Sequence, residues 1–536
     1  MVSDGQILSW IIFLPLVGAA VLLFAPPGRN RIVKIIAAVA SGLPLVLALD
    51  LYRRFDPGLS GLQFRQQVPW IGLYKIEYFV GVDGLSIAML LLTQLLSLIC
   101  ILASWGIEHW HESRGVKGYF ALFLMLQAGM SGVFCAMDFF LFYVFWEVML
   151  LPMYFLIGIW GGPKREYAAI KFFLYTLAGS VLMLVVLLAF YFTKETFNLE
   201  KLREAGTQGA FAADAWKWAF LALFVGFAIK VPVFPFHTWL PLAHVEAPTP
   251  ISVILAGVLL KMGTYGLMRV SMPILPEWTR WFAPFLMALG FINIVYGSLC
   301  AMAQIRGVPK RDPKTGEVTL ENDLKKLVAY SSVAHMGFCL LGLAAGTPAG
   351  LSGCLFQMWN HGIITGMLFL LVGVVYDRAH HRNIDGFGGL WAQMPVYGGL
   401  TALAFFASLG LPGLSGFISE ALCFIGAFQA APSPGLFGWF EGGHLFQVLT
   451  ALSVSGVVLG AAYFLWSYLK IFLGPLNPKY ADLTDCTGRE LATLLPLAAL
   501  VIVLGVWPEP ILGPMQTAIK ELAVDIAQPW VASALR

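Results

Sequence analysis

Six ionisable side chains, one from each of six apolar runs of this chain, are of types that could carry protons. A charged side chain at the centre of a bilayer costs about 2.5–3.5 kcal/mol or more, so such residues face a bundle interior or a water-filled cavity. Carboxylates, amines and imidazoles all exchange protons, so a polar axis at mid-depth that hides these residues from lipid would be a lateral proton relay. The six residues are Glu147, Lys230, Lys261, His335, His361 and Glu420.

Lys261 is the central member of this set. At about 1.5 Å per residue, the run 250–272 is roughly 33 Å long as a helix. A bilayer core is about 30 Å thick, so Lys261 falls near its midplane. That position is too deep for the amine to reach the interface along its own stem. Lys230 lies nearer the end of its run, where reaching the interface is a stronger alternative.

Prolines predict two breaks in the helices that carry these residues. Pro232 has no N–H, so the carbonyl of Ala228 loses its helical partner close to Lys230. The run 393–431 is too long for one crossing and contains Pro412. We therefore expect two half-helices there, with Glu420 just after the break. Broken backbone at membrane depth is tolerated where it is buried in protein or lines water.

Each candidate also has a structural alternative. Glu147 could form a static ion pair that fixes helix packing, and Glu420 could be a helix cap or a carboxylate facing a loop. His335 and His361 have hydroxyl or amide neighbours and could be hydrogen-bonded packing residues.

Two further histidines lie in the loop-like stretch FHTWLPLAHVE, which we expect on the cytoplasmic side. His237 and His244 are candidates for the groups through which protons reach the relay, because imidazole titrates near neutral pH. A role at the protein surface is the equal alternative.

Composition indicates a polytopic membrane protein. The 536 residues are 59% hydrophobic and 12% charged, whereas soluble domains carry about 25% charged residues. The net charge of +3 gives no indication of nucleic-acid binding. The seven cysteines are scattered without a CxxC or Cys/His cluster, so iron–sulfur and zinc sites are unsupported. No glycine-rich nucleotide-binding motif follows a strand pattern.

Hydropathy predicts an all-α polytopic membrane protein with about fourteen transmembrane helices, of which the seventh and twelfth are broken. The first run lacks a basic flank and a cleavage site, so we expect a retained span. The spans are expected near 6–25, 32–52, 84–106, 117–136, 138–160, 168–193, 216–236, 250–272, 279–303, 324–346, 351–376, 393–431, 446–473 and 489–509.

Charge and pattern suggest an orientation and a division into repeats. Lys and Arg are more frequent in one set of alternating loops, which includes the long polar loop 306–326, and this places that set in the cytoplasm with both termini outside. We expect loop 306–326 to be exposed or a hairpin, and the segment after Trp507 to be a short amphipathic helix at the membrane surface. Broken helices in corresponding places of two halves indicate a repeat-built transporter. The expected parts are 1–116 (spans one to three), 117–272 (first repeat), 273–473 (second repeat) and 474–536 (last span and C-terminal segment).

Four long stretches carry a resemblance to a known family. FWEVMLLPMYFLIGIWGG, IKVPVFPFHTWLPLAHVEAPTPISVILAGVLLKMGTYG, DLKKLVAYSSVAHMGF and GLPGLSGFISE closely resemble the proton-pumping antiporter-like membrane subunits of respiratory complex I, the NADH:quinone oxidoreductase. The resemblance covers nearly the whole chain. It implies two inverted repeats, over spans four to eight and nine to thirteen, and a bacterial-type inner (cytoplasmic) membrane.

The resemblance also implies roles for the six residues. Glu147 and Lys230 are similar to the pair in the first half-channel, and Lys261 to the central lysine. His335 and His361 are similar to the connecting groups, and Glu420 to the terminal carboxylate, which is lysine in sister branches of the family. The polar loop 306–326 departs from the compact family pattern.

The implied function is outward proton pumping driven by electron transfer from NADH to quinone in partner subunits. This translocase subunit of the respiratory chain would hold no cofactor or redox centre of its own, because NADH, FMN, iron–sulfur clusters and quinone belong to partner subunits. Its partners would be other complex I membrane subunits, especially the neighbouring antiporter-like subunits, and the lipid bilayer. A subunit of a multisubunit cation/proton antiporter is the first alternative, and a scaffold that only anchors its neighbours is the second.

Overall fold

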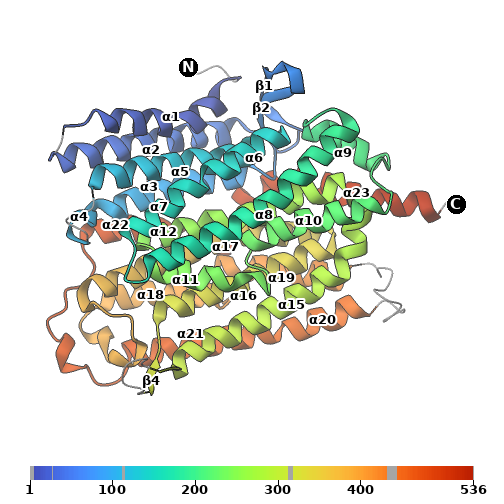
Figure 1. Cartoon of the computed structure of the whole chain (residues 1–536). Coiled ribbons are helices and arrows are strands. Elements are labelled where there is room, and N and C mark those ends of the chain that lie inside the picture. The colour runs from blue at the N-terminus through green and yellow to red at the C-terminus, as the bar shows by residue number, and fades with distance from the viewer. Residues whose placement is uncertain (1–4, 27, 111–114, 312–317, 431–443, 535–536) are drawn as a thin grey trace.

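The computed structural model describes residues 5–26, 28–110, 115–311, 318–430 and 444–534. Long helices run side by side through one bundle, with two small hairpins at its ends (Figure 1). Within the described residues, eleven helical segments are long and apolar enough to cross a membrane. The expectation of an all-α polytopic membrane protein is therefore confirmed at this level.

Three expected spans, 6–25, 216–236 and 393–431, are not among these eleven. The helices that occupy them are shorter, with 17 residues in α1, 16 in α10 and 14 each in α18 and α19. The total of fourteen spans therefore stays a prediction. Residue 431, the last of the third run, lies outside the described residues.

The N-terminal part of the bundle consists of α1 to α9 and the first hairpin. Gln63–Ile71 and Ile76–Val82 pair antiparallel as β1 and β2. The helices are α1 (Ile7–Leu23), α2 (Asn30–Arg54), α3 (Ile87–Ala103), α4 (Ile107–Trp110), α5 (Val116–Cys135), α6 (Phe139–Val148), α7 (Leu150–Trp160), α8 (Arg165–Lys194) and α9 (Leu199–Thr207).

The rest of the chain consists of α10 to α23 and the second hairpin. Val308–Arg311 and Val318–Glu321 pair antiparallel as β3 and β4 inside the expected loop 306–326, whose residues 312–317 lie outside the described residues. The helices are α10 (Ala215–Lys230), α11 (Trp239–Glu246), α12 (Thr249–Ile254), α13 (Leu260–Gly266), α14 (Met272–Ile274), α15 (Pro276–Arg306), α16 (Leu324–Ala345), α17 (Pro348–Ala379), α18 (Pro395–Ser408), α19 (Ser415–Phe428), α20 (Leu445–Ser453), α21 (Ser455–Phe472), α22 (Gly488–Val506) and α23 (Glu509–Ala534).

Burial separates lipid-facing helices from central ones. On α2, Ile35, Val39, Leu43 and Val46 form an exposed apolar stripe at helical spacing, which suits contact with acyl chains. In contrast, the most apolar stretches of Thr249–Ile274 and α17 are entirely buried inside the bundle. A helix that is apolar on every side belongs inside a bundle. Lys261 and His361 lie on these two central segments, which keeps both side chains away from lipid.

The segment with Lys261 is continuous but not uniformly α-helical. Leu255–Leu259 and Leu267–Ser271 are π-helical, and α13 with Lys261 lies between them. π-helical turns inside α-helices are frequent at functional sites. Gly263 and Gly266 bring this segment against α10, because a Cβ at either position would lie within 2.7 Å of atoms of Phe227 or Val231.

The helix that carries Lys230 ends at that residue, and the next helix, α11, begins at Trp239. The expected loss of Pro232 as a donor is compensated locally, because the carbonyl of Ala228 accepts a hydrogen bond from the N–H of Val233 at 2.9 Å. The indole N–H of Trp239 donates to the carbonyl of Ile229 at 2.8 Å. The interruption therefore leaves few backbone groups unpaired.

The C-terminal helix α23 is longer than the short surface helix that the sequence predicts. Its apolar side chains Ile511, Met515, Ile519 and Leu522 are buried against the bundle. The helix contacts α3, α9, α14, α15 and α17, and it lies at the same end of the bundle as β1, β2 and α9 (Figure 1). An ion pair between Arg203 and Asp525, with 2.5 Å between Nε and Oδ2, joins α23 to α9.

Candidate functional site

Lys261 and His361 are in direct contact at the centre of the bundle. The Nζ of Lys261 lies 2.6 Å from the Nδ1 of His361, and it also donates to the carbonyl of Ala256. Both side chains are buried, at 0% and 2% exposure. An amine and an imidazole nitrogen at this distance can share a proton only when one of the two groups is neutral. At this distance the two groups are able to exchange a proton.

The contact continues from His361 towards Glu420. The rings of His361 and His335 lie 5.7 Å apart between centroids. The Nδ1 of His335 is 3.3 Å from the Oε1 of Glu420, within ion-pair distance but without hydrogen-bond geometry. On its other side, the Nε2 of His335 is 3.0 Å from the hydroxyl of Ser408. A small cavity lined by His335, His361 and Glu420 joins these groups.

The break between α18 and α19 positions Glu420. Gly410 has a φ of +78°, which favours glycine, and a Cβ at this position would lie 2.7 Å from the Oε2 of Glu420. The side-chain amide of Asn360, on α17, bonds to two residues of α19 that precede Glu420. It donates to the carbonyl of Ser415 at 2.7 Å and to the hydroxyl of Ser419 at 3.1 Å. These bonds hold the N-terminal turn of α19 against α17, the helix that carries His361.

Glu147 and Lys230 form a separate region of the site. Lys230 is 1% exposed, and its Nζ lies 5.1 Å from the ring centroid of Trp146 and 5.6 Å from that of Phe172. Attraction to aromatic faces offsets part of the cost of burying this amine. Within the described part of the chain, no hydrogen bond or ion pair joins Lys230 to Glu147 or to Lys261. The six residues therefore form a connected group of four and a separate pair.

The two additional histidines are buried, so a role at the protein surface does not fit this structure. His237, 3% exposed, packs against the rings of Phe234 and Tyr296. His244, 0% exposed, stacks on Phe369 with 4.6 Å between ring centroids, and neither of its ring nitrogens has a partner among the described residues. The stretch that looks like a loop in the sequence is helix α11, which explains the burial of His244.

Sequence reasoning missed several buried cations, among them Lys325 and Arg269. Lys325, which the sequence analysis counts within the polar loop, is 4% exposed and donates to the carbonyl of Ala247 at 2.6 Å. Arg269 is 8% exposed and bonds to Asp83 through both terminal nitrogens. The signal for Arg269 is present in the sequence, because a cation stands in the apolar run GLMRVSMPIL eight residues after Lys261.

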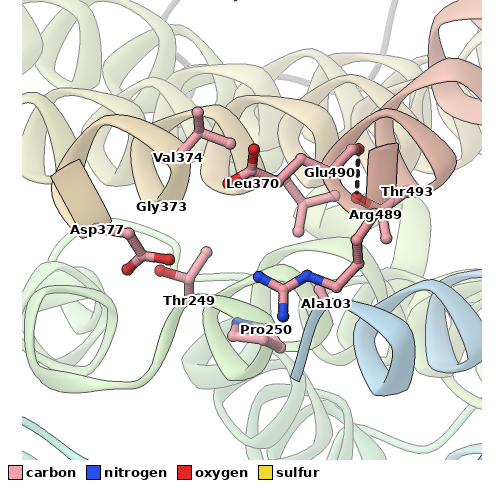
Figure 2. A pocket seen from close by; sticks show the side chains of 10 residues that line it. All are labelled: Ala103, Thr249, Pro250, Leu370, Gly373, Val374, Asp377, Arg489, Glu490 and Thr493. Carbon is pink, nitrogen blue, oxygen red and sulfur yellow. Dashed lines mark hydrogen bonds between the residues drawn. The ribbon is translucent and has the colours of Figure 1, made fainter. Parts of the chain in front are cut away.

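A polar cavity lies at one end of the two central segments (Figure 2). Asp377 and Thr249 line it from the C-terminal end of α17 and the N-terminal end of α12, and the carboxylate of Asp377 points towards Thr249. The guanidinium of Arg489, from α22, points towards Pro250 and Ala103 instead. The segment that carries Lys261 therefore begins at this cavity, and the helix that carries His361 ends at it.

Comparison with known proteins identifies relatives over nearly the whole length. The chain matches the family described as NADH:quinone oxidoreductase/Mrp antiporter, TM, over residues 136–307 and 316–442. It is 42% identical over 517 residues to NADH-quinone oxidoreductase subunit M of Rhodobacter capsulatus, with 94% of this chain and 93% of the relative covered. It is 38% identical to NADH-ubiquinone oxidoreductase chain 4 of Arabidopsis thaliana, with 96% of each covered.

Solved structures show the same fold. A chain of respiratory complex I from Thermus thermophilus with bound NADH matches with a TM-score of 0.81 at 29% identity, over 97% of this chain and 100% of that chain. A chain of the Mrp complex from Dietzia sp. DQ12-45-1b matches with a TM-score of 0.80 at 22% identity, over 98% of each chain.

Proposed function

Because this chain belongs to the NADH:quinone oxidoreductase/Mrp antiporter transmembrane family, we propose that it moves protons outward as a membrane subunit of complex I while partner subunits pass electrons from NADH to quinone. Its relatives carry the names subunit M and chain 4 of that enzyme. The observation that supports proton transfer most directly is the row of contacts from Lys261 through His361 and His335 to Glu420.

The geometry supports a division of labour within the site. Lys261 holds a proton at the centre of the bundle and passes it to His361. His335, between His361 and Glu420, receives it and delivers it to the carboxylate. Each transfer is between groups of complementary type, since an amine or protonated imidazole donates and a neutral imidazole or carboxylate accepts.

Glu147 and Lys230 act on this row through charge rather than through contact. A change of protonation at Lys230 alters the electrostatic potential at depth, where two charges interact far more strongly than in water. Such a change raises or lowers the proton affinity of the Lys261 amine. We assign Glu147 and Lys230 to this control, with His237 and His244 on the route by which protons reach it.

The same proposal covers the architecture and orientation. The chain has fourteen spans with both termini outside, and inverted repeats cover 117–272 and 273–473, each with a broken helix. A buried ionisable residue lies beside each break: Lys230 ends α10, before the first break, and Glu420 lies on α19, after the second. Electron carriers reside in partner subunits, and neighbouring antiporter-like subunits adjoin this chain in the bilayer.

A cation/proton antiporter subunit is not favoured as the alternative. The matched Mrp chain is 22% identical and supports only the fold, whereas the relatives at 42% and 38% identity are named as subunits of NADH oxidoreductases. Proton flux in vesicles that depends on sodium or potassium, without NADH or quinone, would support the antiporter instead.

The test is a Glu420→Gln substitution in the assembled complex reconstituted into vesicles. Glutamine keeps the size of the side chain and removes its ability to exchange a proton. We expect the number of protons moved per NADH oxidised to fall, while Glu166→Gln, at an exposed carboxylate, leaves it unchanged. Wild-type stoichiometry in an assembled Glu420→Gln complex would contradict the proposal.

A further inference from the structure

A buried ion pair that none of the proposed steps uses lies on the same segment as Lys261. The guanidinium of Arg269 donates to both carboxylate oxygens of Asp83, at 2.7 and 2.6 Å. Arg269 and Asp83 are 8% and 9% exposed. Two parallel bonds from a planar guanidinium fix its position more tightly than a single contact does.

Tyr265 lies between Lys261 and this pair in the sequence of the helix. Its hydroxyl accepts from the Nε of Arg269 at 3.0 Å and donates to the carbonyl of Phe134 at 3.0 Å. Tyr265 is fully buried. At about 1.5 Å per residue, Arg269 is roughly 12 Å along the helix from Lys261. Tyr265 stands four residues after Lys261 and four before Arg269, so the three side chains follow one another at helical spacing. Asp83 directly follows β2, at the end of the bundle where β1, β2 and α23 lie (Figure 1).

A cavity of about 50 Å³ meets Arg269 and Asp83 from that end. This volume is large enough for water. Arg203 of α9 and Glu521 and Asp525 of α23 also line the cavity, beside apolar side chains such as Met268. Water that enters this cavity meets the pair.

We propose that Arg269, fixed by Asp83, is an electrostatic plug that prevents protons on Lys261 from leaking to this cavity. The inference rests on the proposed proton-translocating function and adds a positioning and sealing role for two residues. A guanidinium keeps its protons at all accessible pH values, so it cannot relay one. Its positive charge also repels a proton or hydronium ion, as an arginine does in pores that exclude protons.

Asp83 makes this plug tolerable in a buried site. An unpaired guanidinium there would be strongly destabilising, whereas a hydrogen-bonded pair recovers much of the desolvation cost. The pair joins the loop after β2 to the π-helical turn after α13, which are 186 residues apart in the chain. With this route closed, protons on Lys261 leave sideways through His361.

The experiment measures passive proton permeability of vesicles that contain the assembled complex, without NADH or quinone. A pH step is imposed and an internal pH-sensitive dye is followed. Arg269→Gln should raise the rate of pH equilibration several-fold over wild type. Arg203→Gln is the matched control, because it breaks a more exposed ion pair on the same cavity and should leave the rate unchanged.

Two further variants keep the result decisive. Asp83→Asn combined with Arg269→Gln leaves no buried charge unpaired, so this complex should assemble even if the single variant does not, and it should leak. Adding Lys261→Met should abolish that leak. A tight membrane in the assembled double variant would overturn the plug, and so would a leak that persists without Lys261. Since no electron transfer is involved, these outcomes are independent of the pumping result with Glu420→Gln.

Discussion

The Nζ of Lys261 and the Nδ1 of His361 lie 2.6 Å apart at the centre of the bundle, although one hundred positions separate them in the chain. The contact forms because two segments with buried apolar stretches, Thr249–Ile274 and α17, pack against each other. A polar pair on such segments has no solvent to compensate for a lost partner, so each residue depends on the other.

We therefore expect His361→Leu to lower the number of protons moved per NADH oxidised to near the uncoupled level. Leucine fills much of the ring volume but removes the nitrogen that meets Lys261. The measurement is dye-reported acidification of vesicles together with NADH oxidation. His444→Leu, at an exposed histidine, should behave as wild type. Equal proton yields in the two variants would contradict the role of His361.

Glu147 and Lys230 provide a second prediction. Lys230→Ala or Glu147→Ala should abolish quinone-coupled pumping while the complex still assembles, because each removes a charge that acts on Lys261. The amine of Lys230 is buried and the carboxylate of Glu147 belongs to a half-buried residue. Lys217→Ala is a matched control on the same helix, since Lys217 also lies over a tryptophan ring, 4.1 Å from the centroid of Trp281. Native gel electrophoresis checks assembly. Normal pumping in the Lys230 and Glu147 variants would remove this pair from the mechanism.

Gly410 offers a test of the position of Glu420. Gly410 and Gly413 both have positive φ angles, of +78° and +92°, so alanine at either costs about 1 kcal/mol of backbone strain. Only at Gly410 would the added Cβ meet Glu420, at 2.7 Å, whereas nothing lies within 4 Å at Gly413. We expect similar losses of thermal stability, but a lower proton yield only for Gly410→Ala.

A matching reduction of proton yield in Gly413→Ala would show that strain at the break, rather than the place of the carboxylate, limits transfer. Thermal stability is measured by loss of secondary structure on heating in detergent. Proton yield is measured on the same preparations after reconstitution.

Gly426 tests how closely α17 and α19 approach. A Cβ at Gly426 would lie 2.1 Å from the backbone nitrogen of Gly350, so Gly426→Ala forces the helices apart. Overpacking of this kind costs about 1–3 kcal/mol. Gly399→Ala, on α18 with open space around its Cβ, should instead be neutral or stabilising by up to about 1 kcal/mol. Thermal denaturation of the purified subunit complex distinguishes the two, and equal melting temperatures would contradict the packing argument.

Local patterns predicted most helices and the burial of most candidate residues, because both follow from hydropathy within one segment. The burial of Lys261 and of Lys230 are examples, whereas Glu147 is only half-buried. Which groups touch could not be predicted, since the contact of Lys261 with His361 depends on how segments far apart in sequence pack. For the same reason His244 and Lys325 looked like surface residues, although tertiary packing buries both.

Arg269, which the sequence analysis missed, is a second case in which the role of a residue depends on a distant partner. Its place in an apolar run is visible in the sequence, but its meaning depends on Asp83, which stands before a different helix. Likewise, Glu147 and Lys230 have the composition of an ion pair, yet Trp146 occupies the space beside the amine. Residue type indicates what chemistry is possible, and packing decides which partner is available.

The packing of α23 against the bundle has a consequence for biogenesis. This helix is made after α1 to α22, yet it contacts α3, α9, α14, α15 and α17, and its Leu522 and Asp525 line the cavity beside Arg269. A nascent chain that has not yet extended past residue 509 therefore already contains every candidate proton-exchanging residue, but this end of its bundle is uncovered. Synthesis and docking of α23 are then the step that separates this end of a newly inserted subunit from the aqueous phase.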